Sequence, residues 1–326
     1  MKLKNTIAKC VALVLLGGGL AQAQDSHYSQ YFNAPLNVNP AMTGVMNGKL
    51  RAGINFRSQW QNVPDAYGVG GASFDMKYAG FGIGAIVMNE GSANSAFNRF
   101  SFGVTGAYDF MPEEASNHLL VGVHLGLINK SVDLGSLSFG DPNNSNGGSP
   151  NPSGMNITNN SFLTPDVGLG LLWFNGSATS SVNPFLGVSV MHLNQPRDHF
   201  DGDAVLPMRA TVHGGFTIGT DIGMDITPHG QYMNQGGAAS TIVGVNVGYN
   251  LANLEASLVG GLSYRFEDAF IPYIGISYND FLFGFSYDAN TSQLSDVVNL
   301  KQSYEFSLTY IITDRTYKPK FICPRL

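Results

Sequence analysis

Apolar and polar residues alternate with a period of two along most of the chain beyond residue 49. In the segment 281–288, Phe and Tyr side chains occupy the odd positions, whereas Gly284, Ser286 and Asp288 take three of the even positions. A β-strand presents successive side chains to opposite faces, so this segment is predicted to be a strand with one apolar and one polar face. The same alternation recurs in two earlier segments, 118–127 and 254–265.

The alternation predicts fourteen strands in all. Their expected ranges are 49–60, 67–77, 80–89, 97–110, 118–130, 165–174, 181–192, 206–218, 221–232, 240–249, 254–265, 270–278, 281–288 and 302–312. An even number of antiparallel strands, each with an apolar face toward lipid and a polar face toward a lumen, is typical of a transmembrane outer-membrane β-barrel. We therefore predict an all-β fold whose barrel spans residues 49–312.

Composition supports a barrel in the outer membrane. Charged residues are only 12% of the chain, about half the usual share, while the chain has 40 glycines and 11% aromatic residues. No stretch beyond the N-terminal residues has the roughly 20 consecutive apolar residues of a membrane helix. A secreted soluble β-sandwich is the alternative. The net charge of −6 offers no basic stripe for phosphates, so nucleic acid is not an expected partner.

Residues 1–23 have the features of a secretory signal peptide. They contain a basic start, a short apolar run over 11–16 and an Ala-Gln-Ala cleavage box, so cleavage is expected before Gln24. The apolar run is too short to be a membrane anchor. The mature chain then keeps one cysteine, Cys323, which is either a free thiol or part of an intermolecular disulfide.

Residues 24–48, between the signal peptide and the first strand, are expected to be irregular. Pro35 and Pro40 each lack a backbone donor and disfavour the α conformation of the residue before them, and Gly44 marks a turn. Unpaired backbone groups are not tolerated in lipid, so the segment must lie inside the barrel or below it. We predict that Tyr28–Gly44 folds into the lumen as a plug.

The lengths of the connectors predict which end of the barrel faces outside. If the mature N-terminus starts in the periplasm, the connectors after odd-numbered strands are extracellular, and they include 131–164, 193–205, 233–239 and 289–301. The short connectors 78–79, 219–220, 250–253 and 279–280 then lie in the periplasm. The basic tail, 313–326, is also expected there, either disordered or docked to a periplasmic partner.

Two motifs suggest ligand sites but have simpler interpretations. The glycines at positions 80, 82 and 84, and those at 168 and 170, resemble a nucleotide loop, yet no helix follows and the spacing is that of a strand face. Asp198, Asp201 and Asp203 could hold Ca²⁺, but their spacing does not fit an EF-hand, so a solvated acidic loop is favoured. No metal ion or cofactor is expected.

No arrangement of residues indicates catalysis. The seven histidines are scattered, and the chain has no Gly-x-Ser-x-Gly nucleophile motif. Several charged residues fall on the polar strand faces: Asp221, Asp225, Glu255, Arg265, Asp288 and Glu305. They are expected either to be solvated and paired across strands or to grip a guest segment in the lumen.

The segment 30–44 (QYFNAPLNVNPAMTG) is similar to the Q-Y-x-x-N-P-x-x-x-N-P-A-x-x-G opening of the PorP/SprF outer-membrane proteins of the Bacteroidetes type IX secretion system. The matching residues are Gln30, Tyr31, Asn33, Pro35, Asn39, Pro40, Ala41 and Gly44. Further matches in the barrel are Arg57, Gln59, Trp60, Ser286, Tyr287, Asp288 and Glu305, and Cys323 begins a similar ending. The usual S-H-E of the final strand is here Ser303-Tyr304-Glu305, which lacks the titratable histidine.

The resemblance implies a barrel in the outer membrane that works with a secreted client. Such a protein would bind the type IX C-terminal domain of a large adhesin and aid its export or surface anchoring, often for gliding motility. Other members are linked to the secretion machine and to periplasmic peptidoglycan-binding partners. In this view the Tyr28–Gly44 segment either touches the client or only seals the pore.

A fatty-acid-transporter-like channel for small hydrophobic molecules is the second hypothesis. The N-terminal hatch of that family also carries an Asn-Pro-Ala signature, which here is Asn39-Pro40-Ala41. Such a channel needs an apolar pocket and a lateral exit. The inward faces are expected to be polar and glycine-rich with little continuous apolar lining, which favours the client-binding hypothesis.

Overall fold

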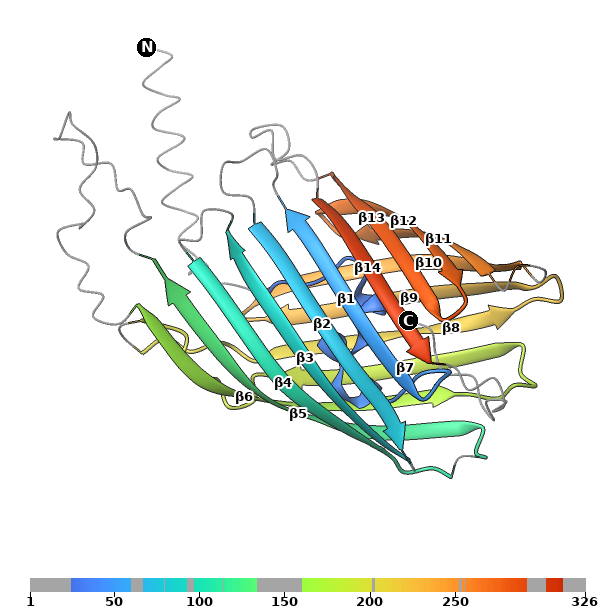
Figure 1. Cartoon of the computed structure of the whole chain (residues 1–326), viewed down its shortest axis with the longest axis horizontal. Coiled ribbons are helices and arrows are strands. Elements are labelled where there is room, and N and C mark those ends of the chain that lie inside the picture. The colour runs from blue at the N-terminus through green and yellow to red at the C-terminus, as the bar shows by residue number, and fades with distance from the viewer. Residues whose placement is uncertain are drawn as a thin grey trace, which may run out of the picture.

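Fourteen antiparallel strands close into one barrel in the computed structural model, and each strand pairs with its neighbours in sequence (Figure 1). The strands are β1 (Leu50–Gln59), β2 (Tyr67–Tyr78), β3 (Phe81–Ser92), β4 (Phe97–Asp109), β5 (Asn117–Val132), β6 (Ser161–Asn175), β7 (Val182–Met191), β8 (Arg209–Gly219), β9 (Met224–Gln235), β10 (Ala238–Leu251), β11 (Ala256–Arg265), β12 (Ala269–Tyr278), β13 (Phe281–Asn290) and β14 (Ser303–Ile312). Pairing of β1 with β14 completes the closure. The predicted fold class and strand number are confirmed.

The structure describes residues 25–59, 67–78, 80–92, 97–112, 114–133, 160–200, 203–251, 254, 256–291 and 303–312. The predicted signal peptide, basic tail and Cys323, and most of the predicted 131–164 and 289–301 loops, lie outside these residues. The division into signal peptide, plug segment, barrel and tail therefore stays a prediction. No helix in the described part of the chain is long and apolar enough to cross a membrane.

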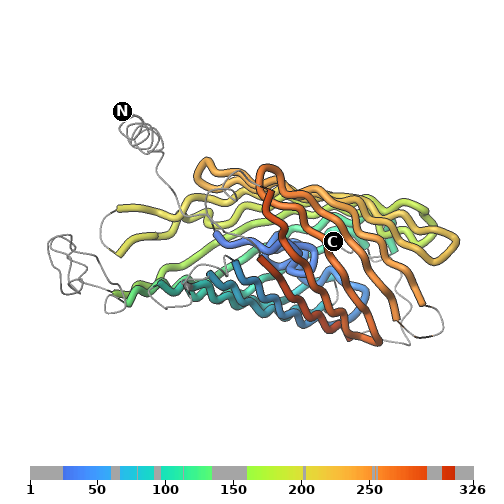
Figure 2. Tube along the Cα trace, turned by 90° about the horizontal axis from the view of Figure 1, so that it is seen from above, coloured from blue at the N-terminus to red at the C-terminus, as the bar shows by residue number. Residues whose placement is uncertain are grey.

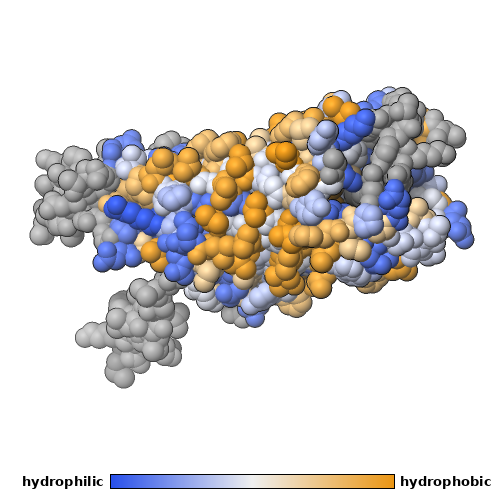
Figure 3. Space-filling view, turned by 90° about the horizontal axis from the view of Figure 1, so that it is seen from below, coloured by the Kyte–Doolittle hydropathy of each residue, from blue (hydrophilic) through white to orange (hydrophobic). Residues whose placement is uncertain are grey.

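The period-two alternation separates a lipid face from a lumen face, as expected. On β13, Phe283 is 54% exposed on the outer surface, whereas Ser286 and Asp288 are buried inside. Figure 3 shows apolar side chains across the middle of one face of the molecule, with hydrophilic side chains toward its ends. An apolar band of this kind matches the hydrocarbon layer of a membrane.

Aromatic side chains cluster in two places at the end of the barrel that has the short connectors. The rings of Phe81 and Tyr108 are 4.7 Å apart, and Tyr108 also contacts Phe110 at 5.0 Å. Phe281 and Tyr310 are 4.6 Å apart on two other strands near the same end. Aromatic belts form at membrane–water interfaces, and short turns are periplasmic in bacterial barrels. This short-turn end is therefore assigned to the periplasm.

Most strand boundaries differ from the sequence prediction by a few residues, and three starts show the reasons. β6 begins at Ser161 because Ser161–Thr164 continue the ladder with β5. β8 begins at Arg209 instead of residue 206, and β9 begins at Met224 because a tight turn with Gly223 at φ +75° precedes it. The pattern of apolar residues marks faces well, but ladder pairing decides where a strand ends.

The predicted loop 233–239 is wrong. β9 and β10 continue through most of it and are joined by a two-residue turn, Gly236-Gly237, whose φ angles are +58° and +87°. Two positive φ angles are the requirement of a type I′ hairpin, which glycine adopts without steric cost. The two glycines therefore form a tight hairpin and not a long loop.

The N-terminal segment, Asp25–Met46, lies inside the barrel between its opposite walls (Figure 2). It forms no continuous helix, as expected, but three short helical turns: η1 (Tyr31–Asn33), α2 (Pro35–Val38) and η2 (Pro40–Met42). Pro35 and Pro40 each occupy the first position of a turn, where the missing N–H costs nothing. The prolines thus begin local turns as well as preventing a longer helix.

The N-terminal segment runs through the barrel from one end to the other. Asp25 contacts Arg99, at the start of β4, whereas Gly44 contacts Asp75, near the end of β2. The first described residue therefore lies at the long-connector end, although the chain was expected to start in the periplasm. The segment crosses the lumen before β1 begins at the short-turn end.

Candidate functional site

The Glu305 carboxylate binds the beginning of the N-terminal segment inside the barrel. Its oxygens accept hydrogen bonds from the backbone N–H groups of Ser29 at 2.7 Å and Gln30 at 3.1 Å. The Gln30 amide donates in turn to Ser286 Oγ at 3.0 Å and to the Glu305 carbonyl at 2.9 Å. A carboxylate that accepts backbone N–H bonds supplies partners that a buried segment needs. These hydrogen bonds join three residues that were predicted as parts of separate motifs: Gln30, Ser286 and Glu305.

Asp288 joins a second set of predicted residues. Its Oδ2 lies 2.8 Å from Arg57 Nη2 and 3.0 Å from Arg265 Nη2, and it accepts from Ser29 Oγ at 2.7 Å. Arg57 also donates to the His27 carbonyl. Buried ions require such pairing because burial removes their water.

Barrel closure explains why these distant motifs meet. Arg57 of β1 is directly opposite Glu305 of β14, and Glu305 is opposite Ser286 of β13. The amide of Gln59 lies 2.9 Å from Arg57 Nη2 on the same strand face. Three adjacent strands therefore present one polar surface to the N-terminal segment.

Asn33 binds the same region of the wall, on β12 and β14, whereas Tyr31 reaches β9. Asn33 Nδ2 lies 3.2 Å from the Tyr273 hydroxyl and 2.9 Å from Ser307 Oγ. The Tyr31 hydroxyl lies 2.5 Å from His229 Nδ1. Burial raises the pKa of the Tyr31 phenol, so this group remains a neutral hydroxyl.

Asn39-Pro40-Ala41 packs closely against glycines on the inner face of the strands. The Asn39 amide donates to the Leu171 carbonyl at 2.9 Å, and its Oδ1 accepts from the Ala41 N–H at the same distance. A Cβ on Gly170 would lie 1.9 Å from Asn39 Oδ1, and one on Gly122 would lie 2.1 Å from the Ala41 nitrogen. Only glycine allows this approach.

The glycine motifs therefore form a packing surface, as the strand interpretation predicted. Gly82 faces the Thr43 carbonyl, and Gly168 faces Met191. Gly80 differs, because it lies in the β2–β3 turn at φ +82° with open space around it.

Gly44 ends the segment at the short-turn end. Its φ is +78°, and its N–H donates to Asp75 Oδ2 at 2.7 Å. Asp75 also pairs with Arg51 at 2.8 Å, and Arg51 donates to the Met42 carbonyl at 3.2 Å. Sequence reasoning missed Arg51 and Asp75. Their only signal was the placement of charge on the polar face of predicted strands.

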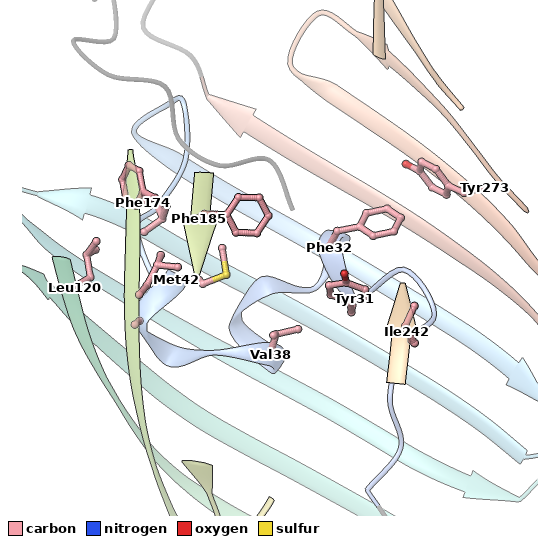
Figure 4. Close-up of a cluster of buried hydrophobic side chains, with 12 residues drawn as sticks. Tyr31, Phe32, Val38, Met42, Leu120, Phe174, Phe185, Ile242 and Tyr273 are labelled. Carbon is pink, nitrogen blue, oxygen red and sulfur yellow. The ribbon is translucent and has the colours of Figure 1, made fainter. Parts of the chain in front are cut away.

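An apolar cluster lies in the lumen beside these polar contacts (Figure 4). The segment contributes Tyr31, Phe32, Val38, Ala41, Met42 and Val45, and the wall contributes Leu120, Leu172, Phe174, Phe185, Ile242 and Tyr273. The expectation of little continuous apolar lining is therefore wrong for this part of the barrel. Inward apolar residues are stable here because the segment, and not water, covers them.

Asp25 anchors the other end of the segment. Its carboxylate contacts Arg99 at 2.5 Å, His192 at 2.5 Å and Arg209 at 3.2 Å. Its backbone N–H donates to Gln235 Oε1 at 2.8 Å. Burial raises the pKa of Asp25, but Arg99, His192 and Arg209 lower it more, so its pKa is well below the ordinary value. The four partners of Asp25 were not predicted as site residues.

Several other predicted residues lie outside this site. Tyr287 is on the outer face of β13, and Trp60 is outside the described residues. Arg265, like Asp288 and Glu305, faces inward as expected. Asp221 and Asp225 are exposed at the short-turn end, where a lumen position was expected, because the strands end there. Glu255 and Asp201 are not among the described residues.

Three small cavities border the N-terminal segment. Their volumes are about 40, 20 and 10 Å³. The largest is lined by Asp25, Leu36, Arg99, His192 and Arg209 among others. Among the described residues, no three His, Cys, Asp or Glu side chains are placed to share a metal ion. These spaces suit a few water molecules and not a bound organic ligand.

Comparison with known proteins gives one family. Residues 20–310 match the family described as "Type IX secretion system membrane protein PorP/SprF". No curated protein matches the chain. Among solved structures, the Ralstonia pickettii toluene transporter TbuX is similar, with a TM-score of 0.52, 11% identity and coverage of 86% of this chain and 94% of that one. The Pseudomonas putida toluene transporter TodX has a TM-score of 0.50, 11% identity and coverage of 87% and 94%. At such identity the likeness shows the barrel fold alone.

Proposed function

This chain belongs to the PorP/SprF family of type IX secretion system membrane proteins, and from that premise we propose that it binds the C-terminal domain of a secreted surface adhesin. It is a multi-pass barrel of the bacterial outer membrane. In the proposed role it aids the export or surface anchoring of the adhesin, in support of adhesion or gliding. The role is one of binding, without catalysis.

The filled lumen is the observation that carries this proposal. The N-terminal segment is packed by polar contacts at Glu305 and Asp75 and by the apolar cluster between them. The cavities beside it measure about 40 Å³ or less, whereas ligand pockets usually measure roughly 300–1,000 Å³. We propose that the segment seals the pore, so the surface available to a client is at the long-connector end.

A tagged full-length chain purified from outer membranes tests the proposal. Copurification of a large surface protein, lost when that protein lacks its C-terminal domain, is the expected result. The matched control is an untagged membrane preparation from the same cells. If no protein with such a domain is enriched in the bound fraction, the proposed client role is wrong.

A channel for small hydrophobic molecules is the second candidate. Its support is the barrel likeness to the toluene transporters TbuX and TodX, together with Asn39-Pro40-Ala41. The apolar cluster in the lumen also matches the chemistry of such molecules, but the segment occupies that space. Uptake of toluene by liposomes containing the intact protein, above the rate of empty liposomes, would support this candidate.

The basic tail, residues 313–326, is proposed to bind a partner in the periplasm. The residues beyond 312 carry four basic side chains and one acidic one before the C-terminus. We propose that this tail docks to a peptidoglycan-binding protein or to a component of the secretion machine. Loss of that copurifying partner after removal of 313–326 is the expected result, with client binding retained.

A further inference from the structure

Three cationic side chains converge on one carboxylate at the long-connector end of the lumen. Arg99 Nη1 and Arg209 Nη1 lie 2.5 and 3.2 Å from the Asp25 oxygens, and His192 Nε2 lies 2.5 Å from Asp25 Oδ2. Arg99, Arg209 and His192 are 7%, 6% and 3% exposed, so each is more than nine-tenths buried. They come from β4, β8 and the residue after β7, whereas Asp25 comes from the N-terminal segment.

The geometry of His192 fixes its charge. Its Nε2 faces Asp25, and its Nδ1 lies 2.7 Å from Asp166 Oδ1. An ionised carboxylate only accepts hydrogen bonds, and an imidazole donates from both nitrogens only in its protonated form. His192 is therefore a cation between two carboxylates.

Charge is balanced in this cluster only while Asp25 is present. The cations are Arg99, Arg209 and His192, and the anions are Asp25, Asp166 and Glu90, which is 3.7 Å from Arg99. The neighbouring Lys130 has its own partner, Asp198, and His124 faces Asp166 at 3.6 Å. Removal of Asp25 would leave one buried positive charge uncompensated, which is costly in a protein interior.

The cluster also has donor capacity that Asp25 does not use. The Nε atoms of Arg99 and Arg209 are buried without a hydrogen-bond partner. The largest cavity, about 40 Å³, lies against both arginines, His192 and Asp25. Buried donors without acceptors are rare in folded proteins, and both arginines also line this cavity. This arrangement is that of an anion site with room beside its present occupant.

Asp25 is held in the cluster by its own contacts and not by a strand ladder. Residues 25–28 have no regular structure, and the contacts of Asp25 are with side chains only. The cluster also lies beside the shortest of the described strand ladders. The β6–β7 ladder has six residue pairs, Leu169–Phe174 with Phe185–Val190, and Asp166 and His192 lie just beyond its end.

We propose that Arg99, Arg209 and His192 form a carboxylate-binding site that Asp25 occupies in this structure, and that an acidic segment of an exported polypeptide displaces Asp25 when it binds. The identity of this ligand rests on the proposed client function. The N-terminal segment thereby acts as an internal competitor of the client.

Chemical rescue tests the site without knowledge of the client. The full chain carrying Asp25→Ala is compared with wild type by the temperature at which heat-modifiable gel mobility is lost. Sodium acetate is titrated against sodium chloride at equal ionic strength. Acetate is expected to raise this temperature in Asp25→Ala and not in wild type, because only the variant has an empty site. Adding Arg99→Gln to Asp25→Ala should abolish the rescue.

Ser26→Ala is the matched control, because Ser26 adjoins Asp25 and its hydroxyl donates to Glu90, so this change leaves the Asp25 carboxylate and the three cations in place. Acetate should leave this variant unchanged. If Asp25→Ala gives no folded barrel, refolding in acetate against chloride provides the same readout. Equal effects of acetate and chloride in either format would overturn the proposed site.

A second measurement separates the site from the client function. A capped Gly-Asp-Gly peptide is expected to bind Asp25→Ala at least about tenfold more tightly than wild type, the equivalent of one charge-assisted hydrogen bond. Capped Gly-Asn-Gly should show no such preference. Acetate rescue with no preference for the acidic peptide would overturn displacement by a polypeptide while leaving the anion site. Loss of rescue with an intact client pull-down would overturn the anion site alone.

Discussion

Gln30 and Glu305, which are 275 positions apart in the sequence, are joined by two hydrogen bonds inside the barrel. The Gln30 N–H donates to the Glu305 carboxylate at 3.1 Å, and the Gln30 amide donates to the Glu305 carbonyl at 2.9 Å. Both side chains are fully buried. The final strand of the barrel thus holds the beginning of the N-terminal segment.

Glu305→Ala should loosen this contact. It leaves the backbone N–H groups of Ser29 and Gln30 buried without an acceptor, at a cost of about 1–3 kcal/mol for each. The expected result is a lower temperature for loss of heat-modifiable gel mobility. Phe306→Leu is the control, because Phe306 is on the same strand but is exposed on the outer face. Equal stability of the two variants would contradict the role of Glu305.

Gly170→Ala should displace the N-terminal segment from its packing contact with β6. The added methyl group would lie 1.9 Å from Asn39 Oδ1, so Asn39 must move away from its bonds to the wall. Overpacking of this kind costs typically about 1–3 kcal/mol. Thermal unfolding measures the loss. Gly260→Ala is the matched control, because a Cβ there meets nothing within 4 Å. Comparable losses of stability in the two variants would argue against close packing of Asn39 on Gly170.

Removal of Tyr28–Gly44 should open the pore. The segment lies in the lumen between the contacts of Glu305 and those of Asp75, so its absence is expected to leave a water-filled passage. Conductance in a planar bilayer is the measurement, with the intact chain as the closed reference. A shortened barrel that folds and remains sealed would show that other parts of the chain close the pore.

Stability should fall as the pH drops below about 6.5, and His27 should account for part of this loss. Burial, together with the charges of Arg265, Arg57 and Arg209, lowers the pKa of His27 well below its ordinary value. The unfolded chain then binds a proton that the folded chain does not. Stability is therefore complete above the unfolded pKa and decreases by up to about 1.4 kcal/mol per pH unit below it.

His27→Gln should remove this component, so its unfolding temperature should change less than that of wild type between pH 7 and pH 5. The loop variant His199→Gln should keep the wild-type dependence, since the His199 ring bonds within its own exposed loop, to the Ala204 carbonyl. Parallel pH profiles for wild type and His27→Gln would refute the assignment.

The sequence by itself determined the wall of the barrel. Alternation in 281–288 indicated which side chains of β13 face lipid, because strand geometry sends neighbouring residues to opposite sides regardless of tertiary context. Proline spacing in 24–48 likewise excluded a continuous helix. The motif residues Gln30, Arg57, Asp288 and Glu305 were also identified from sequence, although their mutual contacts were not.

Only the tertiary structure decided which residues meet across the lumen. Asp25 pairs with Arg99, His192 and Arg209, and Gly44 pairs with Asp75, because the N-terminal segment crosses the barrel from the long-connector end to the short-turn end. Closure of β14 on β1 likewise brings Glu305 beside Arg57. Local periodicity carries no information about either event, since both depend on the path of the whole chain. The inward position of the apolar residues Leu172 and Phe174 is favourable because the N-terminal segment covers them and excludes water.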